Sequence, residues 1–290
     1  MSAFSPEWLG LREPADHVAR DPGLTQTLAH WAQRRGRLEV LDLGAGTGSN
    51  LRYLAPRLGV DQHWRLLDYD AALLAALPAR LLEWAARQGY GVLRASDGLR
   101  IQVDRCRVDV DWSRCDLASL FGAALPLRPH LVTASALLDL ASADWVQGLA
   151  RWCHARDSAA LCVLTYDGRI QWRPSLAGDT VIAERLNRHQ VREKGLGLAL
   201  GPAAAARAVD AFETLGRGVQ VAPSDWHLGP ESLDLQEALA TGWVRAAIEL
   251  DPMVHEEADT WLRSRTEAFR RADAWLRVGH QDLLALPCES

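Results

Sequence analysis

The chain of 290 residues has the composition of an ordinary water-soluble globular protein, 48% hydrophobic and 24% charged, and this length allows one large domain or two small ones. Its 32 basic and 37 acidic side chains give a formal net charge of −5, and the acidic residues are interleaved with arginine along the sequence. This pattern argues against a nucleic-acid partner and against electrostatic binding to a membrane surface.

Membrane insertion, secretion and metal binding are not indicated by the sequence. The longest apolar stretches, residues 71–77 and 131–140, are much shorter than the ~18 residues of a membrane-spanning helix. The first ten residues include Glu7 and lack the basic segment and apolar core of a signal peptide, so we expect a cytoplasmic protein. The five cysteines form no CxxC pair and have no histidine at zinc-site spacing, which predicts neither disulfides nor a metal site.

Strands and helices are predicted to alternate after a short helical opening. Residues 6–31 contain Pro14, Pro22 and Gly23 as breakers and are expected to form two short helices. Short apolar runs then predict strands at 38–43, 64–67, 130–134 and 161–166, and alternation of polar and apolar residues predicts one at 107–112. Helical spacing is found between several of them, at 50–58, 71–88 and 145–156. This alternation predicts a doubly wound α/β fold with a parallel sheet.

The remaining residues are expected to complete a seven-stranded, mostly parallel, Rossmann-like sheet. A helix at 201–215 and a sixth strand at 218–228 precede two amphipathic helices and a closing strand at 277–286, which we expect to be antiparallel. Three regions follow from this order: an N-terminal helical cover at 1–36, a core at 37–230 with an insertion at about 168–200, and a helical cover with the closing strand at 231–290.

A glycine-rich turn, Asp42-Leu43-Gly44-Ala45-Gly46-Thr47-Gly48, follows the first predicted strand. Glycines at such a turn let the backbone approach a ligand closely, because they lack a Cβ atom and tolerate positive φ. A dinucleotide-binding turn would have another glycine at position 49, which is Ser49 here, and this departure disfavours NAD. Asp68 ends the second strand, where a carboxylate can accept both ribose hydroxyl hydrogens, and Asp116 follows the third strand at the same sheet edge.

The segments VLDLGAGTGSN, LLDYD, CDL and LVTASALLDL resemble, in order and spacing, those of class I S-adenosylmethionine-dependent methyltransferases. The resemblance covers residues 38–166 and implies that S-adenosyl-L-methionine is the cofactor. It further implies that Gly44, Ala45 and Gly46 line the methionine part of this cofactor. Ala134 and Ser135 would lie beneath its sulfonium.

The same resemblance implies an adenosine site at the next two strand ends. Asp68 would hold the ribose hydroxyls, with Tyr69 against the adenine. Asp116 would bind the adenine amino group, with the Leu117 backbone beside it. The alternative for either aspartate is a solvated helix cap.

Methyl transfer mainly requires that the acceptor be aligned and water excluded, with a base only where the acceptor loses a proton. Asp139 lies near the expected position of the methyl group and would orient an acceptor hydroxyl or amine, or else cap a helix. Tyr166, at the end of the fifth strand, is a similar candidate. His189 is the leading general base, since its usual pKa of about 6.5 suits neutral pH, with a surface or structural histidine as the alternative. Lys194 would bind a carboxylate or phosphate on the acceptor, or remain solvated.

Rare residue types give a further indication. The chain has thirty-one arginines but one lysine, Lys194, and two asparagines, Asn50 and Asn187, a bias typical of GC-rich coding sequences. Residues kept against this bias are candidates for function, with chance as the alternative. Most of the twelve tryptophans are expected to pack in the core, and one or two could face an apolar substrate.

The sequence therefore predicts a methyltransferase that acts on a small-molecule acceptor, with O-methylation ahead of N- or C-methylation, as a monomer or homodimer. A non-catalytic scaffold protein with the same fold is the main alternative. Aminopropyl transfer and nicotinamide-dependent oxidation are the others. A pocket lined by Asp139, Tyr166 or His189 would favour the enzyme, whereas tryptophan side chains filling that space would favour the scaffold.

Overall fold

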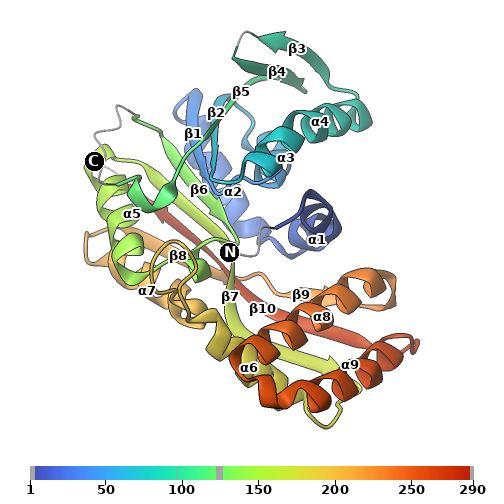
Figure 1. The fold of residues 1–290 in the computed structure, drawn as a ribbon. Helices are drawn as coiled ribbons and strands as arrows, with labels where there is room; N and C mark the ends of the chain where they lie inside the picture. Colours follow the sequence, from blue (N-terminus) through green and yellow to red (C-terminus); the bar gives the residue numbers. More distant parts are fainter. Residues whose placement is uncertain (1–3, 96, 122–126, 288–290) are drawn as a thin grey trace.

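The computed structural model describes residues 4–95, 97–121 and 127–287, which are built around a single mixed sheet (Figure 1). The strand order is β3-β4-β5-β2-β1-β6-β7-β10-β8, and β9 also pairs with β10. Five neighbouring strands run parallel: β5 (Cys106–Arg114), β2 (Asp61–Asp68), β1 (Arg37–Leu43), β6 (Leu131–Ser135) and β7 (Ala159–Arg173). The closing strand β10 (Trp275–Leu286) is antiparallel to both β7 and β8 (Gly218–Pro223). The predicted antiparallel closing strand is confirmed.

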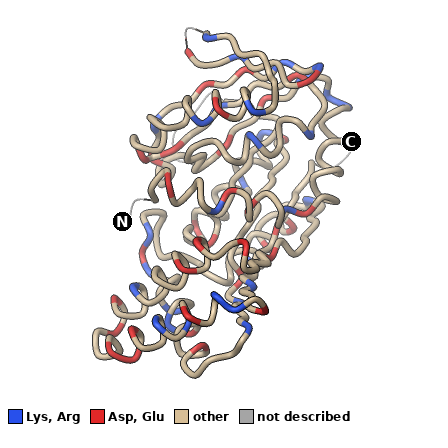
Figure 2. The backbone as a smooth tube through the Cα atoms, turned by 90° about the vertical axis from the view of Figure 1, so that its right-hand side faces the viewer, with Lys and Arg blue, Asp and Glu red and all other residues tan. Residues whose placement is uncertain are grey.

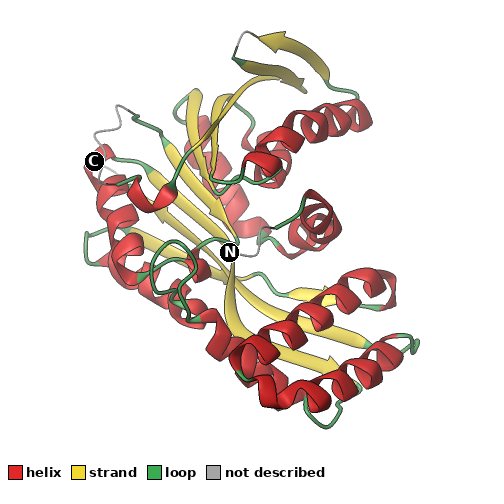
Figure 3. Ribbon diagram, in the orientation of Figure 1, coloured by secondary structure: helices red, strands yellow, loops and turns green. Residues whose placement is uncertain are grey.

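Helices cover both faces of this sheet (Figure 3). Buried apolar side chains join α2 (Pro22–Gln33), α3 (Ser49–Leu58) and α4 (Ala71–Gln88) to one face. A second buried cluster joins α5 (Ala143–Arg156) and α7 (Ala204–Glu213) to the other face. The arrangement is the doubly wound, Rossmann-like fold that the alternation of strands and helices predicted.

The carboxyl end of β7 and the amino end of β10 extend beyond the other strands of the sheet and pack against a further group of helices. Together with β9 (Trp226–Leu228), they pack against α6 (Asp179–Gln190), α8 (Leu233–Leu250) and α9 (His255–Phe269). We call these elements the Trp-rich lobe. In its core, the Trp172 ring makes edge contacts with the Trp243 and Trp261 rings, at centroid distances of 5.8 and 6.0 Å. These three tryptophans have the packing role expected for most of them.

The sheet has ten strands rather than the seven predicted. The additional pair, β3 (Gly91–Ala95) and β4 (Gly98–Val103), forms an antiparallel hairpin beside β5. Two features of the sequence indicate this hairpin: Asp97-Gly98, a typical hairpin dipeptide, and the alternating apolar residues that follow it. Neither feature was used in the prediction.

Two boundaries also differ from the prediction. The fifth strand continues to Arg173, so the insertion expected at about 168–200 begins as strand. The predicted strand at 218–228 is divided into β8 and β9, because Asp225 interrupts it. The Asp225 carboxylate accepts a hydrogen bond from His280 N at 3.0 Å and pairs with Arg169 and Arg277.

Charges of both signs are interspersed along the backbone (Figure 2), in agreement with the absence of a basic stripe from the sequence. Among the residues that the structure describes, no helix combines the length and the apolar character needed to span a bilayer.

Candidate active site

The glycine-rich turn joins β1 to α3 at the carboxyl edge of the sheet. Gly44, Gly46 and Gly48 have φ values of +67°, +54° and +83°, a region that residues with a Cβ rarely adopt. A Cβ atom at Gly44 would lie 3.2 Å from Leu137 Cδ1, and one at Gly46 would lie 2.9 Å from Leu9 Cδ1. Glycine is therefore needed here for conformation, and an added Cβ atom would also displace the ends of these two leucine side chains.

Asp68, the last residue of β2, lies directly against this turn. Its Oδ2 accepts a hydrogen bond from Gly46 N at 2.7 Å, and its Oδ1 accepts one from Asp70 N at 2.8 Å. The residue is 9% exposed, and burial raises the pKa of its carboxyl group. Since each carboxylate oxygen has two lone pairs, both oxygens retain acceptor capacity for a ligand hydroxyl. The predicted placement of Asp68 beside the turn agrees with the structure, and the bond to Gly46 was not foreseen.

The two positions predicted around an adenine lie on neighbouring strand ends. Tyr69 is 50% exposed, and the Arg114 guanidinium lies 4.9 Å from its ring centroid. Asp116 is exposed and caps the 3-10 helix η1 (Leu117–Ser119), where its Oδ1 accepts from Ala118 N at 3.0 Å. Leu117 is buried, and its carbonyl oxygen accepts from the Trp145 indole at 2.8 Å. Asp116 is therefore a cap in this structure, the alternative weighed for it.

Ala134 and Ser135 end β6 next to the glycine turn. Ala134 pairs in register with Leu43, immediately before Gly44, and Ser135 pairs with Val163. At Ala136 the chain leaves the sheet with a φ of +52°. The two residues thus lie at the carboxyl edge of the sheet, next to the glycine turn.

Asp139 lies buried in η2 (Leu138–Leu140), which follows the end of β6 in the chain. Its Oδ1 has no hydrogen-bond partner among the described residues. Burial raises the pKa of the carboxyl group to about 6, opposed by its own backbone N–H group, by the charges of Arg12 and Lys194, and by the backbone N–H group of Tyr166. A buried carboxylate with a free oxygen and a pKa near neutrality has the properties expected of a general base.

The backbone N–H group of Tyr166 acts on the pKa of Asp139, whereas the Tyr166 side chain packs in the Trp-rich lobe. The hydroxyl donates to Asn187 Oδ1 at 2.8 Å, and Asn187 Nδ2 donates to Gly168 O at 3.0 Å. Burial raises the pKa of the Tyr166 hydroxyl. The phenol therefore stays protonated and fixes α6 to β7.

His189 uses both ring nitrogens in contacts with other side chains. Its Nδ1 lies 3.2 Å from Lys194 Nζ, and its Nε2 lies 3.1 Å from Glu249 Oε2. Because an ammonium group can only donate, Nδ1 accepts from Lys194 and the ring proton is on Nε2. Burial lowers the pKa of the imidazole, with the charge of Lys194 acting in the same direction. The lone pair that a general base would need is occupied.

His280 is a buried polar residue at this edge that the sequence analysis missed. It pairs with Tyr166 across β10 and β7, and its ring centroid lies 4.8 Å from that of Trp226. Its Nδ1 has no partner among the described residues, and burial lowers its pKa to about 3, so the ring is neutral. Trp226 in turn donates to Asp16 Oδ1 at 3.1 Å. No local pattern marks these residues, because long-range strand pairing brings them together.

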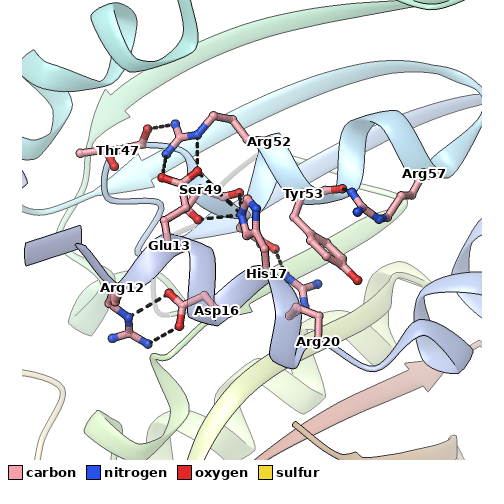
Figure 4. Close-up of polar contacts among 11 residues, drawn as sticks. Arg12, Glu13, Asp16, His17, Arg20, Thr47, Ser49, Arg52, Tyr53 and Arg57 are labelled. Atoms are coloured by element: carbon pink, nitrogen blue, oxygen red, sulfur yellow. Dashed lines mark hydrogen bonds and ion pairs between the residues drawn. The ribbon is translucent and has the colours of Figure 1, made fainter. Parts of the chain in front are cut away.

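Helix α1 (Pro6–Ala19) is fastened to α3 and the glycine turn by the polar contacts of Figure 4. The Arg52 guanidinium donates to both Glu13 oxygens, at 2.7 and 2.6 Å, and to the Thr47 carbonyl oxygen. His17 Nε2 lies 3.1 Å from Ser49 Oγ. We call this set of contacts the α1 latch.

One of the two asparagines lies immediately behind the turn. Asn50 Nδ2 donates to Asp42 Oδ1 at 2.8 Å and to Thr133 Oγ1 at 3.0 Å, and Asn50 Oδ1 accepts from Arg20 Nη1 at 3.0 Å. Asp42 is fully buried, and burial raises the pKa of its carboxyl group to about 7. Asn50 thus ties β1, β6 and the opening helices together beneath the glycine turn.

Comparison with known proteins gives similarity to solved structures alone. No protein-family model and no curated protein matches the chain. A SAM-dependent methyltransferase from Geobacter sulfurreducens, in complex with S-adenosyl-L-homocysteine, is 18% identical, with a TM-score of 0.45 over 98% of this chain and 100% of that chain. The corresponding complex from Thiobacillus denitrificans is 17% identical, with a TM-score of 0.44 over 98% and 100%. The cyclopropane synthase MmaA2 from Mycobacterium tuberculosis is 12% identical, with a TM-score of 0.45 over 89% and 82%. At these values, function has to be argued from the site itself.

Proposed function

We propose that the chain is an S-adenosyl-L-methionine-dependent methyltransferase that acts on a small-molecule acceptor. The observation that carries the proposal is the Asp68 carboxylate, which is fixed to the glycine turn by Gly46 N at 2.7 Å and retains acceptor capacity at the sheet edge. Ligands of open α/β sheets bind outside the carboxyl ends of the strands, where these groups lie.

The residues present fit this cofactor. Gly44, Ala45 and Gly46 would hold the methionine part through their backbone, with the ends of the Leu9 and Leu137 side chains, which lie over the two glycines, moving aside, and Asp68 would accept hydrogen bonds from the ribose. The adenine would contact Tyr69, Asp116 and Leu117, with Ala134 and Ser135 under the sulfonium. When bound, the cofactor supplies an activated methyl group.

In the proposed reaction, Asp139 takes the general-base role that the sequence analysis gave first to His189. Asp139 Oδ1 accepts a hydrogen bond from the acceptor hydroxyl and takes its proton as the methyl group is transferred. This supports O-methylation ahead of N-methylation, because a hydroxyl must lose its proton as it reacts, whereas an amine attacks through its lone pair first. A carbon acid would use the same base as a hydroxyl. The backbone N–H group of Tyr166 favours the ionised form of the Asp139 carboxylate, because it lowers the pKa of that group. The proposal further includes a cytoplasmic monomer or homodimer without a nucleic-acid partner, in keeping with the interleaved charges.

Calorimetric titration of the purified protein with S-adenosyl-L-methionine and with NAD, side by side, tests the cofactor. Saturable binding of S-adenosyl-L-methionine alone is expected. Binding of NAD, or of neither compound, would overturn the proposal. Transfer of a labelled methyl group to pooled small hydroxyl, amine and carbon acids then tests the activity, and cofactor binding without transfer to any of them would favour a scaffold protein.

Asp68→Ala is expected to weaken S-adenosyl-L-methionine binding by about 1–3 kcal/mol, the scale of lost hydrogen bonds to a charged group. Asp61→Ala is the matched control, because Asp61 begins the same strand at the opposite sheet edge and also accepts a backbone hydrogen bond, from Arg107 N at 2.8 Å. Calorimetry should find the wild-type affinity in the control. Equal losses in the two variants would place the ribose elsewhere.

A further inference from the structure

The one lysine of the chain is held in place by a chain of polar contacts from the Trp-rich lobe. Lys194 Nζ donates to His189 Nδ1 at 3.2 Å, and His189 Nε2 donates to Glu249 Oε2 at 3.1 Å. The loop around the lysine is itself fixed, because the Glu193 carboxylate accepts from Gly195 N at 2.8 Å and from Gly197 N at 3.1 Å. The position of the ammonium group is therefore determined by α6, α8 and the loop together.

The lysine loop packs on the segment that follows Asp139. Leu196 forms a parallel bridge with Ala141 and accepts a hydrogen bond from Ser142 N at 3.1 Å. Leu200 N donates to Ala141 O at 2.8 Å. This packing brings Lys194 close enough to Asp139 for the charge of each residue to act on the pKa of the other.

The ammonium group of Lys194 has unused donors. Within the described ranges, no ion pair of 4.0 Å or less joins Lys194 to a carboxylate, although its surroundings are partly buried. His189 takes one of the three N–H donors. Arg12, the other cation that acts on Asp139, is by contrast paired with Asp16 through two hydrogen bonds, of 2.9 and 3.0 Å. A half-buried cation held near the proposed base, with no carboxylate of the described residues within 4.0 Å, has the arrangement of an anion-binding residue.

We propose that Lys194 forms an anion-binding subsite for the methyl acceptor, and hence that the acceptor carries a carboxylate or phosphate group. His189 and Glu249 are positioning residues for this lysine. The inference rests on the proposed function for the identity of the ligand as a methyl acceptor, whereas the anion-binding property of Lys194 is independent of it.

The single lysine makes a direct test possible. Protein labelled with ¹³C at the lysine ε-carbon gives one side-chain NMR signal, which is titrated with acetate and, separately, with inorganic phosphate at constant ionic strength. A saturable shift and a raised pKa of Lys194 are expected, since a bound anion favours the charged form. The probe with the lower dissociation constant distinguishes a carboxylate from a phosphate ligand.

Arg87→Lys supplies the internal reference, because Arg87 is exposed on α4, away from the site. The signal of the introduced lysine should move without saturation. Glu249→Gln should weaken anion binding at Lys194 about two- to fivefold, as expected for the loss of a partly exposed charge contact. If the two lysine signals respond alike to both anions, the inference is overturned.

The acceptor itself provides the second test. For an acidic acceptor found in the methyl-transfer screen, Lys194→Met should raise KM about tenfold or more, the scale of a lost charged hydrogen bond. With kcat measured at a pH high enough for Asp139 to be ionised in both proteins, kcat should change little. Lys194→Arg should restore part of the loss, and the amide of the same acceptor should not discriminate between the proteins. An unchanged KM for the acid would contradict the inference while leaving cofactor binding intact. Anion binding by a protein that binds no S-adenosyl-L-methionine would instead contradict the proposed function alone.

Discussion

Gly46→Val is expected to reduce the affinity for S-adenosyl-L-methionine by at least about 100-fold, or about 2.7 kcal/mol. Gly46 has a φ of +54°, where a β-branched residue is strained, and a Cβ atom there would lie 2.9 Å from Leu9 Cδ1. The added side chain would also occupy the space where the backbone approaches the methionine part. Isothermal titration calorimetry measures the loss directly.

Gly36→Val separates steric exclusion from backbone strain. Gly36 has a φ of +78° with nothing within 4 Å of an added Cβ atom, and it lies between α2 and β1. This variant carries a similar strain without blocking the site, so it should bind the cofactor as the wild type does. A comparable loss of affinity in both variants would show that the turn affects binding through stability alone.

Asp139→Asn is expected to lower the rate of methyl transfer by about 10²- to 10⁴-fold, the usual contribution of a general base, without changing the affinity for S-adenosyl-L-methionine. Burial raises the pKa of the Asp139 carboxyl group from 3.8 to about 6, and the base must be ionised to accept a proton. Wild-type activity should therefore fall as the pH drops through about 6. The residual activity of the variant should lack this acidic limb.

Asp144→Asn is the matched control, because Asp144 is an exposed carboxylate in the first turn of α5, close to Asp139 in the sequence. Its rate and pH profile should be those of the wild type. The base assignment would be wrong if Asp139→Asn kept the wild-type rate, or if its acidic limb were retained. In either case His280, the neutral imidazole at the same edge, would be the next residue to substitute.

Local pattern was sufficient to predict that Asp68 and Asp116 lie at neighbouring strand ends. Asp68 and Asp116 follow strands whose apolar runs are evident in the sequence, and parallel strands place their ends at one edge of the sheet. The β3–β4 hairpin was missed although Asp97-Gly98 signals it, and the extension of β7 to Arg173 was missed because its polar residues resemble a loop. These errors do not move the site, since both features lie away from the glycine turn.

Local pattern was insufficient for the acceptor side. The contact between His189 and Glu249 depends on how α6 packs on α8, and the pairing of His280 with Tyr166 depends on the register of the closing strand. Neither follows from nearby sequence. The rarity of lysine and asparagine was the useful signal here, because Lys194 contacts His189, Asn187 bonds to Tyr166, and Asn50 lies behind the turn.

Helix α1 has a thermodynamic consequence for the binding of two ligands. One helix contacts the glycine turn through Leu9 and the Trp-rich lobe through the bond between Asp16 and Trp226. A displacement of α1 would therefore change its contacts at both places. In the proposed function these two places bind the cofactor and the acceptor, and any factor by which one ligand changes the affinity of the other through α1 must act equally in both directions.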